Sequence, residues 1–157
     1  MRRIAIACVL TLLGAGFVSG AALADDARAA DRAAIQELMW RYVRALDTFD
    51  AEAYAAVFTE DGSFGQTKGR EALKQMIRNL AQNRTADSPP MYHMIANTHI
   101  EFIDENTARM HSYWMTVFGA AGQGSAPRVA AAGRGVDELV RVNGQWLIRS
   151  RNVAPQD

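Results

Sequence analysis

The chain changes its residue pattern once, at Pro89-Pro90, and this change limits the folds that it can adopt. Before the two prolines, from Ala33 to Leu80, apolar residues recur at the three- and four-residue spacing of amphipathic helices. After them, from Met91 to Val153, strand-like segments alternate with short turns. Consecutive prolines fit neither a helix nor a central strand. Helices followed by an antiparallel meander predict the α+β class.

The expected elements follow from this spacing and from the turn residues between them. Asp50 is a good helix N-cap, and Asn143-Gly144 is a strong hairpin signal. The expected helices are 33–47, 51–58 and 70–80, and the expected strands are 63–65, 91–103, 107–118, 128–142 and 145–153. Consecutive hairpins predict a curved antiparallel sheet, which the N-terminal helices close into a cone-shaped α+β barrel with a pocket. We expect the loop 81–90 to form its mouth or lid, and Gly133-Arg134-Gly135 to mark a bulge or bend.

Residues 1–24 have the pattern of an export signal. Arg2 and Arg3 precede an apolar stretch, and Ala22-Leu23-Ala24 matches an A-x-A cleavage site. The apolar stretch is interrupted by glycines and is shorter than the ~20 residues of a membrane helix. We therefore expect a signal peptide at 1–24, a lead-in at 25–30, one domain at 31–157 and a periplasmic or secreted protein with no membrane attachment. An uncleaved anchor is the alternative.

Composition excludes several classes of function. The one cysteine, Cys8, lies in the expected signal, so the mature chain would contain neither a disulfide nor a thiolate nucleophile. Removing Arg2 and Arg3 from the 17 basic residues leaves 15 against 17 acidic residues, with no basic stripe for nucleic acid. The chain has no G-x-S-x-G elbow, P-loop or dinucleotide G-x-G-x-x-G motif. A small apolar molecule or a protein partner remains, and we expect no cofactor.

The candidate chemistry rests on Asp47 and His93. Asp47 lies near the C-terminal end of the first helix, where the helix dipole disfavours a carboxylate. His93 enters an otherwise apolar strand and requires a polar partner. If the fold joins them, Asp47 accepts the imidazole Nδ1–H and Nε2 becomes a general base near neutral pH. The alternative is a surface aspartate and a core histidine with another partner.

Further residues are candidates for substrate contact, and each also has a purely structural explanation. Tyr42 and Tyr113 are candidates to donate to a substrate oxygen, and Trp114 is a candidate pocket wall; all three also suit a core. By strict alternation, Arg149 and Arg151 share one face of the last strand. Arg151 is the candidate to hold a substrate carbonyl or carboxylate, but we favour an exposed charged stripe, because arginine is rarely buried unpaired.

A metal site is not expected. His93, His99 and Glu101 fall on one face of their strand by strict alternation. Positions six residues apart lie ~20 Å apart, which is too far for His93, His99 and His111 to share one ion. We expect His99 and Glu101 to be solvent-side or strand-pair residues.

Residues Asp31 to Val153 resemble the SnoaL-like branch of the nuclear-transport-factor-2-like superfamily. The resemblance is carried by RAAIQELMWRYVRALDTFDAEAYAAVFTEDGSF, by GREALKQMI, by the histidine-led strand and by GRGVDELVRVNGQWLIRSRNV. It implies the cone-shaped fold and a homodimer. It leaves the reaction open, since this superfold includes dehydratases, isomerases, cyclases, dehydrochlorinases and ligand binders.

The resemblance also implies roles for individual residues. Asp47 and His93 fall where scytalone dehydratase, bile-acid 7α-dehydratase and hexachlorocyclohexane dehydrochlorinase keep an Asp–His dyad, and Tyr42 resembles a pocket tyrosine of the bile-acid enzyme. The other polar residues of scytalone dehydratase have no counterpart at Val117, Gly133 and Gly135. The resemblance thus implies a cofactor-free, dehydratase-like lyase or isomerase acting on a small apolar carbonyl-type substrate. The alternative is a non-catalytic ligand-binding or dimerisation module.

Overall fold

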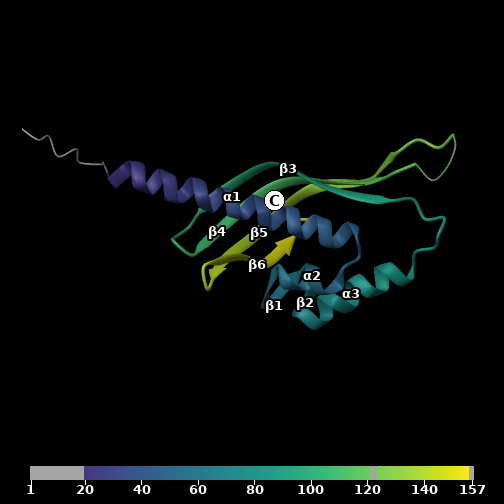
Figure 1. The fold of residues 1–157 in the computed structure, drawn as a ribbon, viewed down its shortest axis with the longest axis horizontal. Helices are drawn as coiled ribbons and strands as arrows, with labels where there is room; N and C mark the ends of the chain where they lie inside the picture. Colours follow the sequence, from purple (N-terminus) through teal and green to yellow (C-terminus); the bar gives the residue numbers. More distant parts are fainter. Residues whose placement is uncertain (1–19, 121, 123, 156–157) are drawn as a thin grey trace, which may run out of the picture.

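The computed structural model describes residues 20–120, 122 and 124–155, and in this part of the chain three helices pack against a six-stranded sheet (Figure 1). The elements are α1 (Gly20–Asp47), α2 (Ala51–Ala56), β1 (Phe58–Phe64), β2 (Thr67–Lys68), α3 (Arg70–Gln82), β3 (Met91–Phe102), β4 (Thr107–Phe118), β5 (Arg128–Val142) and β6 (Gln145–Asn152). Residues 1–19, most of the expected export signal, lie outside the described residues. None of the helices in the described ranges combines the length and apolarity needed to cross a membrane.

The sheet has the strand order β2-β1-β6-β5-β4-β3. Strands β3 to β6 form an antiparallel meander, whereas β1 pairs with β6 in parallel. The sheet is curved but open, with β2 and β3 as its edges, so the strands do not close into a complete barrel. The α+β class and the cone with N-terminal helices against a curved sheet are confirmed.

Helix α1 lies along the sheet and buries one apolar stripe against it (Figure 1). The buried stripe consists of Ile35, Leu38, Met39, Tyr42, Val43 and Leu46. A polar contact fixes the N-terminal half of the helix: the buried carboxylate of Asp31 accepts from Trp146 Nε1 at 3.1 Å and pairs with Arg141. The helix covers the expected lead-in at 25–30, because this alanine-rich segment has high helix propensity.

A tight reversal separates α1 from α2. Phe49, two residues after the end of the helix, adopts a positive φ of 57°, and the Asp50 side chain caps α2 by accepting from the Ala53 N–H at 3.0 Å. Asp47 is therefore the last residue of α1. The second helix ends earlier than expected, because Phe58 pairs with Ile148 and joins the sheet.

A bulge in β3 changes which residues of this strand face the helices. In β3 the register to β4 shifts between Ala96 and His99, where Asn97 has a φ of 50°, so one extra residue lies in β3. His99 and Glu101 therefore face away from the helices, opposite to His93, and the shared face expected from strict alternation is wrong. Their expected solvent exposure is confirmed.

The glycines of β5 serve a different purpose from the one expected. The register between β4 and β5 is regular at Gly133 and Gly135 and shifts instead at Thr116/Val117. A Cβ atom on Gly133 would lie 2.8 Å from Cζ2 of Trp114. Gly133 therefore leaves room for the indole to lie against β5. The expected hairpin at Asn143-Gly144 is present, with positive φ at both residues.

Candidate active site

Asp47 and His93 meet where the C-terminal end of α1 lies beside the start of β3. The imidazole Nδ1 lies 2.7 Å from Asp47 Oδ1. The backbone N–H of His93 also donates to the same carboxylate, at 3.1 Å to Oδ1 and 3.2 Å to Oδ2. Their side chains are only 16% and 19% exposed. These donors compensate the carboxylate for its unfavourable place at the C-terminal end of a helix.

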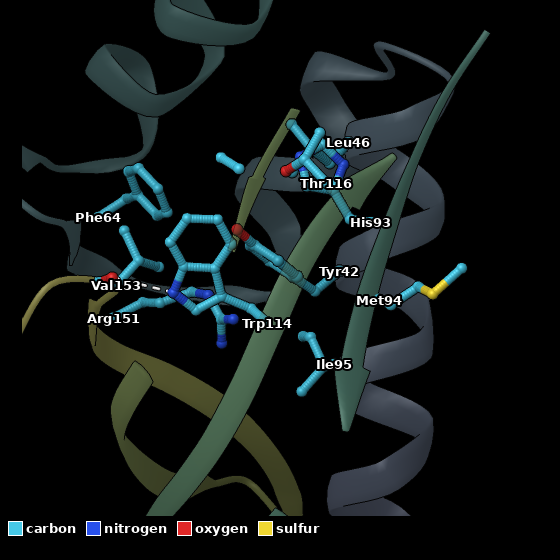
Figure 2. A pocket seen from close by; sticks show the side chains of 11 residues that line it. Tyr42, Leu46, Phe64, His93, Met94, Ile95, Trp114, Thr116, Arg151 and Val153 are labelled. Atoms are coloured by element: carbon cyan, nitrogen blue, oxygen red, sulfur yellow. Dashed lines mark hydrogen bonds between the residues drawn. The ribbon is translucent and has the colours of Figure 1, made fainter. Parts of the chain in front are cut away.

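This contact fixes which imidazole nitrogen is free. A carboxylate only accepts hydrogen bonds, so Nδ1 carries the proton when the ring is neutral, and Nε2 is the basic nitrogen. His93 lines a chamber of about 220 Å³, together with residues of α1 and of strands β1, β3, β4, β5 and β6. Figure 2 shows His93 near Leu46 and Thr116 at one end of this group. The base therefore borders a partly open cavity.

The chamber is mostly apolar. Its apolar walls come from Leu46, Phe64, Met94, Ile95, Trp114, Ala131 and Val153. Besides His93, the residues with polar side chains are Tyr42, Thr116 and Arg151. An apolar space with few polar groups at defined places is typical of a small-molecule site.

Tyr42 and Arg151 form a polar end of the chamber. The Arg151 guanidinium carbon lies 4.5 Å from the centroid of the Tyr42 ring, and both side chains are buried. Figure 2 shows the Tyr42 ring between His93 and Arg151 in this view. Burial raises the pKa of Tyr42 more than the nearby Arg151 cation lowers it, so the hydroxyl stays protonated and remains a donor.

Arg151 is held by an acid that the sequence analysis did not single out. Arg151 Nη1 donates to Asp137 Oδ2 at 2.5 Å, and the two side chains are 2% and 0% exposed. Burial raises the pKa of Asp137 to about 6, although the Arg151 cation opposes this shift. One signal for Asp137 was present: it shares a strand face with Leu139, a core position.

Three buried polar atoms near this pair lack a hydrogen-bond partner among the described residues. They are Asp137 Oδ1, Arg151 Nε and Ser112 Oγ. Ser112 and Asp137 lie on the helix-facing side of the adjacent strands β4 and β5, where Ser112 pairs with Gly135. Such atoms are usually satisfied by water or by a ligand.

The burial of Arg151 contradicts the exposed stripe that we favoured. Leu139 of β5 pairs with Ile148 of β6, but its neighbour Glu138 pairs with Ser150. One step along β5 thus matches two steps along β6, and Arg149 is the extra residue of a bulge. After this bulge Arg151 faces the helices, as Ile148 does, whereas Arg149 stays exposed. The outward stripe is therefore correct for Arg149 and wrong for Arg151.

Tyr113 and Trp114 occupy opposite faces of β4. Tyr113 is 55% exposed on the outer face and does not line the chamber, contrary to its expected place at the substrate. Trp114 lines the chamber, and its Nε1 donates to the carbonyl oxygens of Arg134 and Val153, both at 2.9 Å. Figure 2 shows the bond to Val153. These bonds and the gap at Gly133 fix the plane of the indole.

Within the described ranges, no three His, Cys, Asp or Glu side chains gather at a point where they could hold a metal ion. His99 and His111 lie opposite each other across β3 and β4, with ring centroids 6.3 Å apart. They lie on the outer face of the sheet, away from the chamber.

The family profile of the SnoaL-like domain matches residues 27–152. The chain belongs to the SnoaL-like family. This family includes polyketide cyclases and dehydratases. No functionally curated protein matches the sequence.

Solved structures agree with this membership. Rv3472, a protein of unknown function from Mycobacterium tuberculosis, is 26% identical with a TM-score of 0.67, over 77% of this chain and 73% of its own. A protein from Catenulispora acidiphila in complex with S-DNPA is also 26% identical, with a TM-score of 0.68 over 80% and 93% of the two chains. An NTF2-like protein with a cystatin-like fold from Novosphingobium aromaticivorans is 22% identical, with a TM-score of 0.70 over 90% and 93%, and supports the fold.

Proposed function

We propose that this SnoaL-like chain is a cofactor-free, dehydratase-like lyase or isomerase that removes a proton from carbon beside the carbonyl of a small apolar substrate. The observation that carries this proposal is the 2.7 Å contact between Asp47 and His93 in the wall of an apolar chamber. The contact leaves Nε2 of His93 free to act as the base. Tyr42 and Arg151 supply a donor and a positive charge within the same chamber.

The proposed reaction begins with transfer of the C–H proton to His93 Nε2. The electron pair of the broken bond moves to the carbonyl oxygen and forms an enolate, while Asp47 stabilises the new imidazolium. The Tyr42 hydroxyl and the Arg151 guanidinium stabilise the enolate oxygen, and their effect is large because the chamber is apolar. In a dehydration the enolate re-forms the carbonyl and expels a β-hydroxyl group, which takes the proton from His93 and leaves as water. In an isomerisation His93 returns the proton to another carbon.

A second candidate function is ligand binding without catalysis. The complex of the Catenulispora acidiphila protein with S-DNPA supports it, because a protein of similar structure holds this small molecule. A binding protein needs the chamber but not a free Nε2 on His93. The two functions are therefore separated by the consequence of removing the imidazole.

We further propose that the chain forms a homodimer through the outer face of its sheet. Tyr92, Tyr113 and Val129 belong to β3, β4 and β5 and are 49–56% exposed. Large apolar side chains exposed together favour association with another surface. Sedimentation of the wild-type chain and of Tyr113→Lys tests this proposal, since a lysine on this face would dissociate such a dimer.

A periplasmic or secreted location is proposed as well. Its support is the pattern of residues 1–24, with Arg2 and Arg3 before an apolar stretch and an A-x-A sequence at Ala22 to Ala24. Expression of the full chain, fractionation of the cells and N-terminal sequencing test it. A mature chain that begins at Asp25 is the expected result.

Hydrogen–deuterium exchange tests the proposed chemistry without knowledge of the natural substrate. α-Tetralone, a compact aromatic ketone, is incubated with the chain in D₂O, and loss of its α-proton signal is followed by NMR. We expect the wild-type chain to accelerate exchange, His93→Ala to abolish the acceleration, and the control His99→Ala, on the outer face, to retain it. Equal acceleration by His93→Ala contradicts the mechanism. Binding of α-tetralone by the wild-type chain without exchange favours the binding function.

A further inference from the structure

A second cavity lies on the other side of His93, between α1 and the edge strand β3. This groove has a volume of about 410 Å³. Its apolar walls come from Met39, Trp40, Val43, Met94, Ile100 and Met110. The remaining lining residues other than His93 carry no charge. The groove therefore suits a neutral hydrocarbon segment better than a charged one.

The groove and the chamber share part of their walls. His93, Met94 and Ile95 of β3 line both. Met94 is on the outward face of β3 and His93 and Ile95 on the inward face, so the two spaces adjoin at this edge strand. The imidazole held by Asp47 lies at this junction. A molecule that occupied both spaces would thus place its middle beside the proposed base.

Trp40 gives a reason to expect an occupant of the groove. It is 60% exposed, and Met94 on the facing strand is 52% exposed. Neither is needed to fill the core beneath, where Met39, Val43, Ile100 and Met110 are already buried. Covering the exposed tryptophan and methionine with an apolar partner would remove apolar surface from water and so lower the free energy.

The fold keeps this groove open. β3 is an edge strand, so nothing of the sheet lies beyond it in the described part of the chain. Its bulge, where Asn97 has a positive φ, is next to Thr98, which lines the groove. A bulge bends its strand, and here the bend lies beside α1. Asp47 secures the strand to the helix at one end of the groove, through His93, and Arg32 of α1 donates to the Ile100 carbonyl at 3.3 Å near the other end.

The volumes of the two spaces indicate the size of the ligand that they accommodate jointly. The chamber alone, at about 220 Å³, is smaller than the ~300–1,000 Å³ of pockets for drug-sized ligands. The chamber and the groove together fall within that range. We propose that the groove is a second subsite, which binds the unbranched apolar tail of a substrate whose carbonyl head occupies the chamber. This inference rests on the proposed function and adds an elongated, neutral tail to the substrate class.

A homologous series of methyl ketones tests the subsite. Binding of 2-hexanone, 2-octanone, 2-decanone and 2-dodecanone to the full chain is measured by calorimetry. Once the chamber is filled, each further methylene is expected to lower Kd about twofold to fourfold, as partial to full burial of a CH₂ group predicts. Trp40→Ala is expected to reduce this dependence on length while 2-hexanone binds as before. Trp40→Phe is expected to restore part of it.

The control is Leu80→Ala, because Leu80 is an exposed apolar residue of α3 that lines neither space. It should keep the full dependence on length. A Kd that is independent of chain length, or a dependence that Trp40→Ala leaves intact, overturns the subsite. Sedimentation of Trp40→Ala adds a further test: a change from dimer to monomer would show that a second copy of the chain covers the groove, which also overturns it.

The failure of the subsite and the failure of the proposed function give different results. If the chain exchanges the α-protons of 2-hexanone but shows no dependence on length, the subsite is wrong and the proposed function stands. If 2-dodecanone binds more tightly than 2-hexanone through Trp40 but neither ketone exchanges, the subsite is supported as a ligand site and the proposed catalysis is wrong.

Discussion

Asp47 holds His93 at two points, since its carboxylate accepts both the imidazole Nδ1–H and the backbone N–H of the same residue. The first contact sets the tautomer and the second sets the position of β3 relative to the end of α1. One side chain thus positions both the proposed base and the strand that carries it. Removal of the carboxylate is expected to affect activity and stability together.

The first prediction concerns Asp47→Asn. Its neutral amide oxygen accepts more weakly than a carboxylate and does not stabilise an imidazolium, so the exchange rate of α-tetralone should fall by about 10² to 10⁴-fold. The free energy of unfolding in urea should fall by about 1–3 kcal/mol, because buried donors lose a charged acceptor. Asp50→Asn is the control, since asparagine is an equally good N-cap. Normal exchange by Asp47→Asn would contradict the role of the dyad.

The second prediction concerns the Tyr42 hydroxyl. Tyr42→Phe keeps the ring in contact with Tyr54 and Phe58, whose centroids lie 5.3 Å and 6.2 Å away, so the fold should be retained. Loss of one donor to the enolate should slow exchange by about 10² to 10³-fold. Tyr113→Phe removes a hydroxyl on the outer face of β4, away from the chamber, and its exchange rate should be unchanged. Similar rates for the two variants would remove Tyr42 from the mechanism.

The third prediction is the pH dependence of stability that Asp137 causes. Burial raises the pKa of this acid from 3.8 to about 6 in the folded state. The folded chain therefore binds more protons than the unfolded chain between these values, and stability contributed by Asp137 is lost as pH rises through this window. The free energy of unfolding of the wild-type chain, minus that of Asp137→Asn, should decrease by on the order of 2 kcal/mol from pH 4 to pH 7. An increase over this range would contradict the raised pKa.

The fourth prediction separates stability from function at the buried ion pair. Arg151→Met leaves Asp137 buried without its cation and should destabilise the chain by about 3–5 kcal/mol at pH 7. The double variant Arg151→Met/Asp137→Leu removes both charges and should recover most of that loss, as measured by urea unfolding. Its exchange activity should stay low, because the chamber lacks its positive charge. Recovery of activity in the double variant would show that Arg151 serves the fold alone.

The fifth prediction concerns Gly133. A Cβ at this position would approach the Trp114 indole to 2.8 Å, so Gly133→Ala should displace the ring and destabilise the chain by about 1–3 kcal/mol. Trp114→Phe in the same chain should relieve the clash, because the smaller ring leaves the space that Cζ2 occupied. Gly135→Ala is the control: its nearest contact is Ser112 Oγ at 3.2 Å, which gives a milder clash. Equal loss of stability in both alanine variants would contradict this explanation.

Much of the fold could be predicted from local pattern. The first helix ends at Asp47 as expected, although it begins earlier, and the strand 107–118 has both expected ends. Turn residues and apolar periodicity are properties of short stretches of sequence. The approach of Asp47 to His93 was a conditional prediction. Local pattern showed only that each residue lacked a local partner, and the family resemblance implied that the two residues form a pair.

The rest depended on registers that no local pattern contains. His99 and Arg151 were placed on the wrong faces because one extra residue in β3 and one in β6 reverse the alternation after them. Asp137 was missed for the same reason, since its partner faces it only after the bulge in β6. The groove beside Trp40 required the spatial relation of α1 to an edge strand.

The bulge at Arg149 has a consequence for how such a protein changes over time. Excising this single residue would leave Trp146, Ile148 and Arg151 in unbroken alternation on one side of the strand, with the cation still facing inward. In a chain without this residue, simple alternation along the strand would correctly predict that Arg151 faces inward. Insertion or deletion of one residue, without any substitution at the chamber, therefore decides whether sequence alternation identifies the inward arginine.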